Sequence, residues 1–232
     1  MSRWATLWKH LPRLAPLLLC LGAAGCSSLL RTDAPPLQIY TLGAAAMSSG
    51  DPADPRPGAA ASLRVAHPLA GPGLGTSRIV LLQPDHRMNV YAASAWSADT
   101  PALVESLATQ TLRAAGEWRS VEDAASPFPA HYLLQISIRR FDADYSGGAG
   151  VPPTVHVTLD CTLGSGGGHR LLASFVAAGS AAAGANRLRE VVTAFQQATD
   201  QALASMSRQA LAAVRTTRSG SSRSRNPTGA ER

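Results

Sequence analysis

The chain has 232 residues, of which 45% are hydrophobic and 16% charged, so it is long enough to bury a sizeable core, and disorder throughout is excluded. The formal net charge of +6 comes from the two ends, because the segment 26–214 holds 13 basic and 14 acidic residues. A nearly neutral body lacks the basic face of a nucleic-acid-binding domain, and three cysteines are too few for a disulfide framework.

The first part of the chain is typical of a secretory signal peptide, which we assign to residues 1–25. Arg3, Lys9 and Arg13 give it a basic start. The apolar stretch that follows, 14–25, has 12 residues, whereas a membrane-spanning helix needs ~20. We therefore expect this segment to direct export and then to be removed.

The end of this segment, Ala23-Ala24-Gly25-Cys26, resembles the lipobox of bacterial lipoproteins. The resemblance implies that the chain is cut before Cys26 and that this residue is the lipid-attachment site, carrying diacylglycerol and an N-acyl chain such as palmitate. Two or more acyl chains make membrane anchoring stable. Ser27 stands where enteric inner-membrane lipoproteins carry Asp, which implies the outer membrane, with the protein facing the periplasm. The alternative is a soluble secreted protein with a Cys near its cut site.

After the lipidated tether, 26–36, the pattern predicts strands and a long loop. Residues 37–42 alternate apolar and polar, as a half-buried strand does. The Ala-, Gly-, Pro- and Ser-rich segment 43–61 predicts a flexible loop. Further strands are expected at 63–66, 78–82 and 88–91, the last two as a hairpin, with a turn-rich passage at 70–75.

A first helix is expected from about Pro101 to Ala115, because apolar residues recur there at helical spacing. Thr100 is the expected N-cap, followed by Pro at the first helical position, and Gly116 suits the C-terminal end. A short strand is expected between Trp118 and Val121.

The second half of the chain predicts an antiparallel meander with strands at 131–141, 154–163 and 169–178. A long helix follows from about Arg187 to Val214, with Asn186 as a candidate cap. Residues 215–232, rich in Arg and Ser, predict a disordered tail. The element order therefore predicts one α+β domain over 37–214, a mostly antiparallel sheet with two helices packed on one face.

The sequence holds no G-x-S-x-G, H-E-x-x-H, C-x-x-C or P-loop motif. We therefore predict no catalytic residue, no metal site and no cofactor beyond the acyl chains on Cys26. His156 with Asp160 could form an acid/base or metal pair, but the alternation of their strand favours a solvated face. Asp142 and Asp144 are read as a charged strand end, and Cys161 as a buried, inert thiol.

Trp96 is a large aromatic in a chain with only 5% aromatic residues. It is predicted either to fill the end of the core or to mark a contact surface, and it is the candidate partner-contact residue. The basic tail could contact anionic lipid or peptidoglycan.

Several motifs resemble, as an ordered set, the auxiliary lipoprotein family of ABC-type transporters, the PqiC-like proteins. The resemblance covers about residues 26–214 and departs in the loop at 43–61 and in the Arg-rich tail. After the lipobox, the motifs are Tyr40-Thr41-Leu42, Gly73-Leu74-Gly75-Thr76-Ser77-Arg78-Ile79, Tyr91 to Trp96 before a Pro-led helix, and Gly116 to Val121.

The resemblance implies a non-enzymatic role in moving lipids or other hydrophobic molecules across the Gram-negative envelope. Members accompany an ABC ATPase, a permease and a substrate-binding protein with an MCE domain, so the expected partners are an MCE-domain protein and outer-membrane lipid, and a homo-oligomer is possible. Two other classes stay open: a free-standing periplasmic lipoprotein that binds a hydrophobic ligand itself, and a periplasmic hydrolase.

Overall fold

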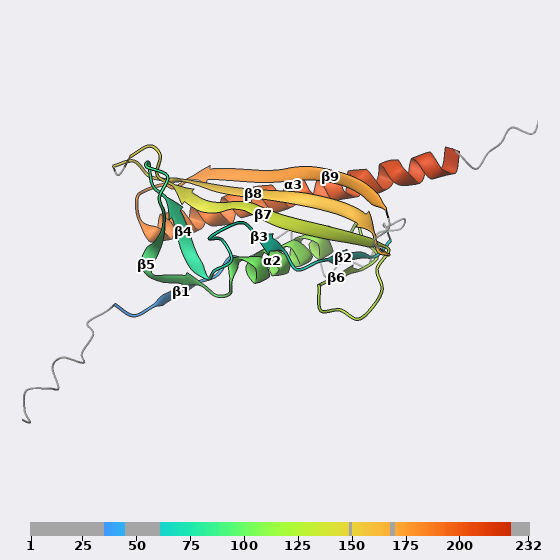
Figure 1. Cartoon of the computed structure of the whole chain (residues 1–232), viewed down its shortest axis with the longest axis horizontal. Helices are drawn as coiled ribbons and strands as arrows, with labels where there is room; N and C mark the ends of the chain where they lie inside the picture. Colours follow the sequence, from blue (N-terminus) through green and yellow to red (C-terminus); the bar gives the residue numbers. More distant parts are fainter. Residues whose placement is uncertain (1–34, 45–60, 149, 168–169, 224–232) are drawn as a thin grey trace, which may run out of the picture. The chain divides into compact units, whose positions relative to one another are not determined.

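The three longest strands form the expected antiparallel meander. The computed structural model describes residues 35–44, 61–148, 150–167 and 170–223, with side chains up to residue 217. Within it, β7 (Tyr132–Asp144) pairs with β8 (Thr154–Ser165), and β8 pairs with β9 (Leu171–Ala182) (Figure 1). Alternation along β7 and β8 turns one face of the meander inward. The α+β class predicted from the sequence is confirmed.

The other edge of β7 is paired by three short strands that follow one another along it. These are β2 (Leu63–Val65), β3 (Leu69–Ala70) and β4 (Arg78–Leu82), and all three run parallel to β7. The sequence predicted β2 and β4 but not β3, which falls at the edge of the turn-rich passage. Both edges of β7 are therefore occupied.

Two further strands continue the sheet beyond β4. The predicted hairpin is present, with β4 antiparallel to β5 (Met88–Trp96), and β1 (Gln38–Tyr40) lies parallel to the end of β5. β5 is longer than predicted because it continues past Ala93, whose φ of 47° lets the strand bend. At the other end of the sheet, β6 (Val121–Glu122) pairs with β2.

The first helix described, α2 (Thr100–Ala114), begins one residue earlier than predicted. Asp99, rather than Thr100, is the N-cap, and its carboxylate accepts a hydrogen bond from the Ala102 N–H at 2.9 Å. Gly116 has a φ of 63° and follows the helix end, as expected of a residue in the left-handed region.

The second helix, α3 (Leu188–Arg223), is longer than the sequence indicated. The prediction of a disordered tail from residue 215 is wrong for 215–223, which are helical. The Thr216 and Thr217 hydroxyls bond the carbonyl groups one turn back, and Arg215 forms an ion pair with Glu117 at 3.1 Å. These contacts continue a helix whose apolar stripe ends at Val214.

Several predicted features lie outside the described residues. They are the signal peptide 1–25, Cys26 with the tether up to 34, most of the loop at 43–61, and the last part of the tail, 224–232.

The sheet curves around the N-terminal half of α3. On one side, β9 packs against the helix, and the Ser180 N–H donates to Gln201 Oε1 at 3.1 Å. On the other side, Gln196 bonds both the N–H and the C=O of Gly43, just after β1, at 2.9 and 2.7 Å. Glutamine side chains of α3 thus form hydrogen bonds with backbone groups at two edges of the sheet. These backbone groups are then not free to pair with a strand of another chain.

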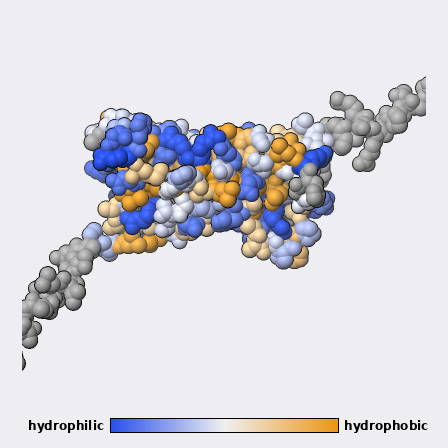
Figure 2. Space-filling view, viewed as in Figure 1, coloured by the Kyte–Doolittle hydropathy of each residue, from blue (hydrophilic) through white to orange (hydrophobic). Residues whose placement is uncertain are grey.

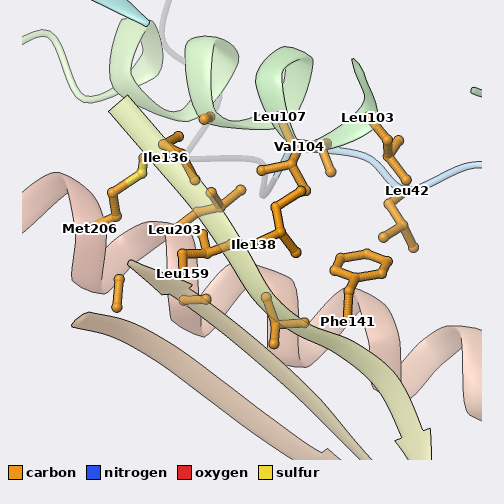
Figure 3. Packing of buried hydrophobic residues seen from close by; sticks show 14 of the residues in the cluster. Leu42, Leu103, Val104, Leu107, Ile136, Ile138, Phe141, Leu159, Leu203 and Met206 are labelled. Atoms are coloured by element: carbon orange, nitrogen blue, oxygen red, sulfur yellow. The ribbon is translucent and has the colours of Figure 1, made fainter. Parts of the chain in front are cut away.

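The core lies between the inner face of the sheet and the two helices. Figure 3 shows side chains of α2, β7 and α3 pointing toward one another, including Leu107, Ile138 and Leu203. The helix α3 comes unusually close to β9 because of a glycine: a Cβ at Gly179 would lie 2.1 Å from the Ala198 backbone oxygen. The close packing of α3 on the sheet, expected from its small residues, is therefore present.

This close contact predicts that Gly179→Ala destabilises the protein by about 1–3 kcal/mol, because the obstacle is helix backbone and cannot rotate away. Chemical denaturation of the purified chain measures the free energy of unfolding. Gly184→Ala is the matched control, since a Cβ there would have its nearest neighbour at an ordinary 3.5 Å. Equal stability of the two variants would contradict the packing described for α3.

Candidate functional site

The partner-contact prediction for Trp96 is wrong, and the alternative, a core position, is confirmed. The Trp96 side chain is 2% exposed and packs edge-on against Phe141 and Phe195, with ring centroids 5.9 and 5.1 Å apart. The end of β5 carries it beneath α3, where this tryptophan fills space in the core. Cys26, the other predicted site residue, lies outside the described residues.

The carboxylates considered as metal or acid/base groups are paired with arginines. Arg139 donates to Asp160 at 2.9 Å, and Arg140 bonds both Asp142 and Asp144, at 2.7 and 3.0 Å. Burial pushes the pKa of Asp144 up, but hydrogen bonds from the Ser146 backbone and from Arg140 hold it below its usual value. Among the described residues, no group of three or more His, Cys, Asp or Glu could hold a metal ion.

Cys161 is a buried thiol, as predicted. Its side chain is 1% exposed, and burial, with a smaller contribution from the neighbouring Asp160 charge, raises its pKa to about 12. At neutral pH the sulfur is therefore protonated and lacks the thiolate that nucleophilic chemistry requires.

An open groove of about 570 Å³ lies where the long strands meet the β4–β5 turn. Its apolar surface comes from Leu81, Pro84 and Tyr145, and its polar groups come mostly from the turn. The lining residues are Leu81, Gln83, Pro84, Asp85, Arg87, Tyr145 and Asn186. These residues come from three separate parts of the chain.

A chain of hydrogen bonds fixes the wall of this groove. Tyr145 donates its hydroxyl proton to Asn186 Oδ1 at 2.7 Å, so Tyr91, whose hydroxyl lies 2.8 Å from that of Tyr145, must be the donor in their contact. Burial raises the pKa of Tyr91, and the bond to Tyr145 raises it further, so the Tyr91 hydroxyl stays protonated and can donate. The chain joins β5, the end of β7 and the segment before α3.

On the turn side, the groove carries charges of both signs. Asp85 and Arg87 form an ion pair at 2.5 Å, and Arg87 also donates its backbone N–H to the Asp85 carboxylate. A groove with an apolar base, a paired charge at its rim and a hydrogen-bonded wall suits contact with an amphipathic segment of a partner.

A second, polar cleft of about 390 Å³ lies along α2. It contains His67, Glu105 and Ser106, residue types that a hydrolase would use. His67 Nδ1 lies 2.7 Å from Glu105, while the Ser106 hydroxyl accepts a bond from Gln110 at 2.8 Å. The imidazole and the hydroxyl therefore have different partners in the described structure, and the arrangement is not that of a nucleophile held by its base.

Among the described residues, no helix is both long and apolar enough to cross a membrane.

The chain matches the family model described as "ABC-type transport auxiliary lipoprotein component" over residues 40–209. These bounds include the last residue of β1 and most of α3. No curated protein matches the sequence.

Solved structures share the fold. A Xanthomonas campestris protein assigned to the family DUF330 is 22% identical, with a TM-score of 0.68 over 78% of this chain and 99% of that one. An uncharacterised protein is 15% identical, with a TM-score of 0.57 over 75% of this chain and 99% of that one. At these identities the likeness concerns the fold alone.

The tyrosine chain of the groove predicts that Tyr145→Phe lowers the free energy of unfolding by about 1 kcal/mol, because Tyr91 and Asn186 both lose a hydrogen-bond partner. A double-mutant cycle with Tyr91→Phe, measured by chemical denaturation, isolates the bond between the two hydroxyls. We expect Tyr91→Phe to lower the free energy of unfolding less in the Tyr145→Phe variant than in the unchanged protein. Strictly additive effects would contradict the coupling of the two side chains.

Proposed function

The chain belongs to the family of ABC-type transport auxiliary lipoproteins, and from this membership we propose that it links an MCE-type transport system for lipids or other hydrophobic compounds to the outer membrane. The family match over residues 40–209 carries the proposal. An auxiliary component implies further components, and the resemblance of the sequence names them as an ATPase, a permease and a periplasmic MCE-domain protein.

The anchor in this proposal is Cys26, 14 residues before the family match begins. Diacylglycerol and an N-acyl chain on Cys26 hold the protein at the outer membrane, facing the periplasm, after a signal peptide of residues 1–25 is removed. The tether then gives the domain its reach, and the folded domain provides the contacts. A homo-oligomer of this domain would suit a ring-shaped MCE partner.

The groove beside the β4–β5 turn is the proposed docking surface for the periplasmic partner. Its base is apolar, the Asp85–Arg87 pair lies at its rim, and the tyrosine chain fixes its wall. Such a surface gives shape and charge complementarity without catalytic groups, which agrees with a family defined by transport rather than by a reaction.

The alternative of a free-standing binding module would need a cavity between the sheet and the long helix. That space is filled where the structure describes it: Gly179 abuts the α3 backbone, and Phe195 packs against Phe141 and Trp96. The packing therefore favours a role in contacting partners over one in enclosing a ligand.

The test is crosslinking in cells with a photoreactive amino acid at Gln83, which lines the groove, followed by identification of the captured proteins by mass spectrometry. We expect an MCE-domain protein to be captured from Gln83. A probe at the exposed Ser174 of β9 is the matched control. Capture from Ser174 alone would move the docking surface to β9.

Fractionation of cells that express the Cys26→Ser variant tests the anchor. The variant should lose acylation and leave the outer-membrane fraction while its domain still folds. A variant still firmly bound to the outer membrane would contradict lipid anchoring through Cys26. Folded, acylated chains that carry the probe at Gln83 or Ser174 and capture no transport component would contradict the proposed function.

A further inference from the structure

The chain segments that form β1 and β5 contain no charged residue. Residues 35–44 and 88–98 contain no Asp, Glu, Lys or Arg, although such residues make up 16% of the chain. Within these segments, the Leu37 and Ile39 side chains are 55% and 58% exposed. Figure 2 shows apolar residues at the lower left of the domain, the end at which Figure 1 places β1.

The two aliphatic side chains point away from the core because of the way β1 is paired. Tyr40 lies opposite Trp96 and is partly buried against the core. Successive residues of a strand face opposite sides, so Ile39 faces outward, and Leu37, which immediately precedes β1, is exposed as well. The side chains of Ile39 in β1 and of Leu37 just before it are therefore exposed to solvent.

These two residues lie in the first part of the folded domain after the proposed anchor. The inference therefore rests on the proposed function, specifically on acylation of Cys26. The ten residues 27–36 span at most ~35 Å when extended, so Leu37 stays within that distance of the bilayer. Two aliphatic side chains bind a membrane weakly by themselves, but a tether of this length makes the contact intramolecular and raises its effective concentration.

We propose that β1 rests on the bilayer, with Leu37 and Ile39 inserted at the lipid interface. An exposed apolar surface marks a membrane or a protein contact. The lipid surface is the occupant here because the patch follows the proposed anchor after only ten residues of chain and because its own residues include none of the charged groups that give a protein interface its specificity. Gln196 of α3 holds Gly43 at the end of the same segment, so this contact would fix the orientation of the whole domain relative to the membrane.

The test uses tryptophan as a depth probe in the full-length, acylated protein. Of the four tryptophans, Trp4 and Trp8 lie in the proposed signal peptide, and Trp96 and Trp118 are 2% and 3% exposed. The two native tryptophans of the mature chain are thus buried, and we expect lipid not to quench their fluorescence. Ile39→Trp and Leu37→Trp are each reconstituted into phosphatidylethanolamine and phosphatidylglycerol vesicles whose acyl chains carry bromine, a contact quencher of tryptophan.

Fluorescence at positions 39 and 37 should be quenched and shifted to shorter wavelength in brominated vesicles. The matched control is Leu171→Trp, at the far end of the long strands, where the native side chain is 64% exposed; it should keep its emission. Because both test positions are exposed, the substitutions disturb no packing, and circular dichroism confirms the fold.

The outcomes separate this inference from the function on which it rests. Failure of the wild-type chain to sediment with vesicles would overturn the lipid anchor, and the inference with it. Sedimentation without quenching at either position 37 or 39 would overturn the inference alone. Equal quenching at position 171 would also overturn it, because the domain would then touch lipid without a preferred face.

Discussion

Strand β7 is paired along both edges, and the rest of the fold follows from this. On one side, a single partner, β8, matches it along its whole length, and on the other side β2, β3 and β4 share the edge between them. A strand with partners on both sides leaves few backbone groups to solvent and can be apolar on its inner face, which β7 offers to both helices (Figure 3).

The helix α3 turns this sheet into a scaffold with defined surfaces. It is held by β9 through Gly179 and Ser180 and by the segment after β1 through Gln196. The curvature that results places Trp96 inside the core rather than on a surface. It also leaves two surfaces with different chemistry: a groove with paired charges beside the β4–β5 turn, and the exposed aliphatic residues at β1. The first suits a protein partner and the second suits lipid.

Much of the fold could be predicted because the longer elements repeat their patterns over many residues. The alternation of β7 and β8 and the helical stripe of α3 each provide several turns or residue pairs of evidence. The parallel pairing of β2, β3 and β4 could not be predicted, since strands of two to five residues carry almost no information on partner or register. The end of α3 was missed because Thr216 and Thr217 bond the helix backbone, which an apolar pattern does not record.

The candidate site divides in the same way. Cys161 was predicted as a buried thiol because its apolar neighbours alternate around it, whereas the lipobox makes Cys26 a prediction that lies outside the described residues. The groove was missed because its residues, from Leu81 to Asn186, come from separate turns without a shared motif. Only the tertiary structure brings Tyr91, Tyr145 and Asn186 into one hydrogen-bonded chain.

The pairing of early strands with β7 also constrains the order of folding. Leu63 pairs with Tyr132 and Leu82 with Asp144, separations of 69 and 62 residues. Because a chain is synthesised from its N-terminus, β2 and β3 cannot pair until β7 has been made. In contrast, β7, β8, β9 and α3 can assemble from contacts closer in sequence. We therefore expect the C-terminal half to form first and the N-terminal strands to join last, so the folding chain passes through a stage in which those strands need protection from aggregation.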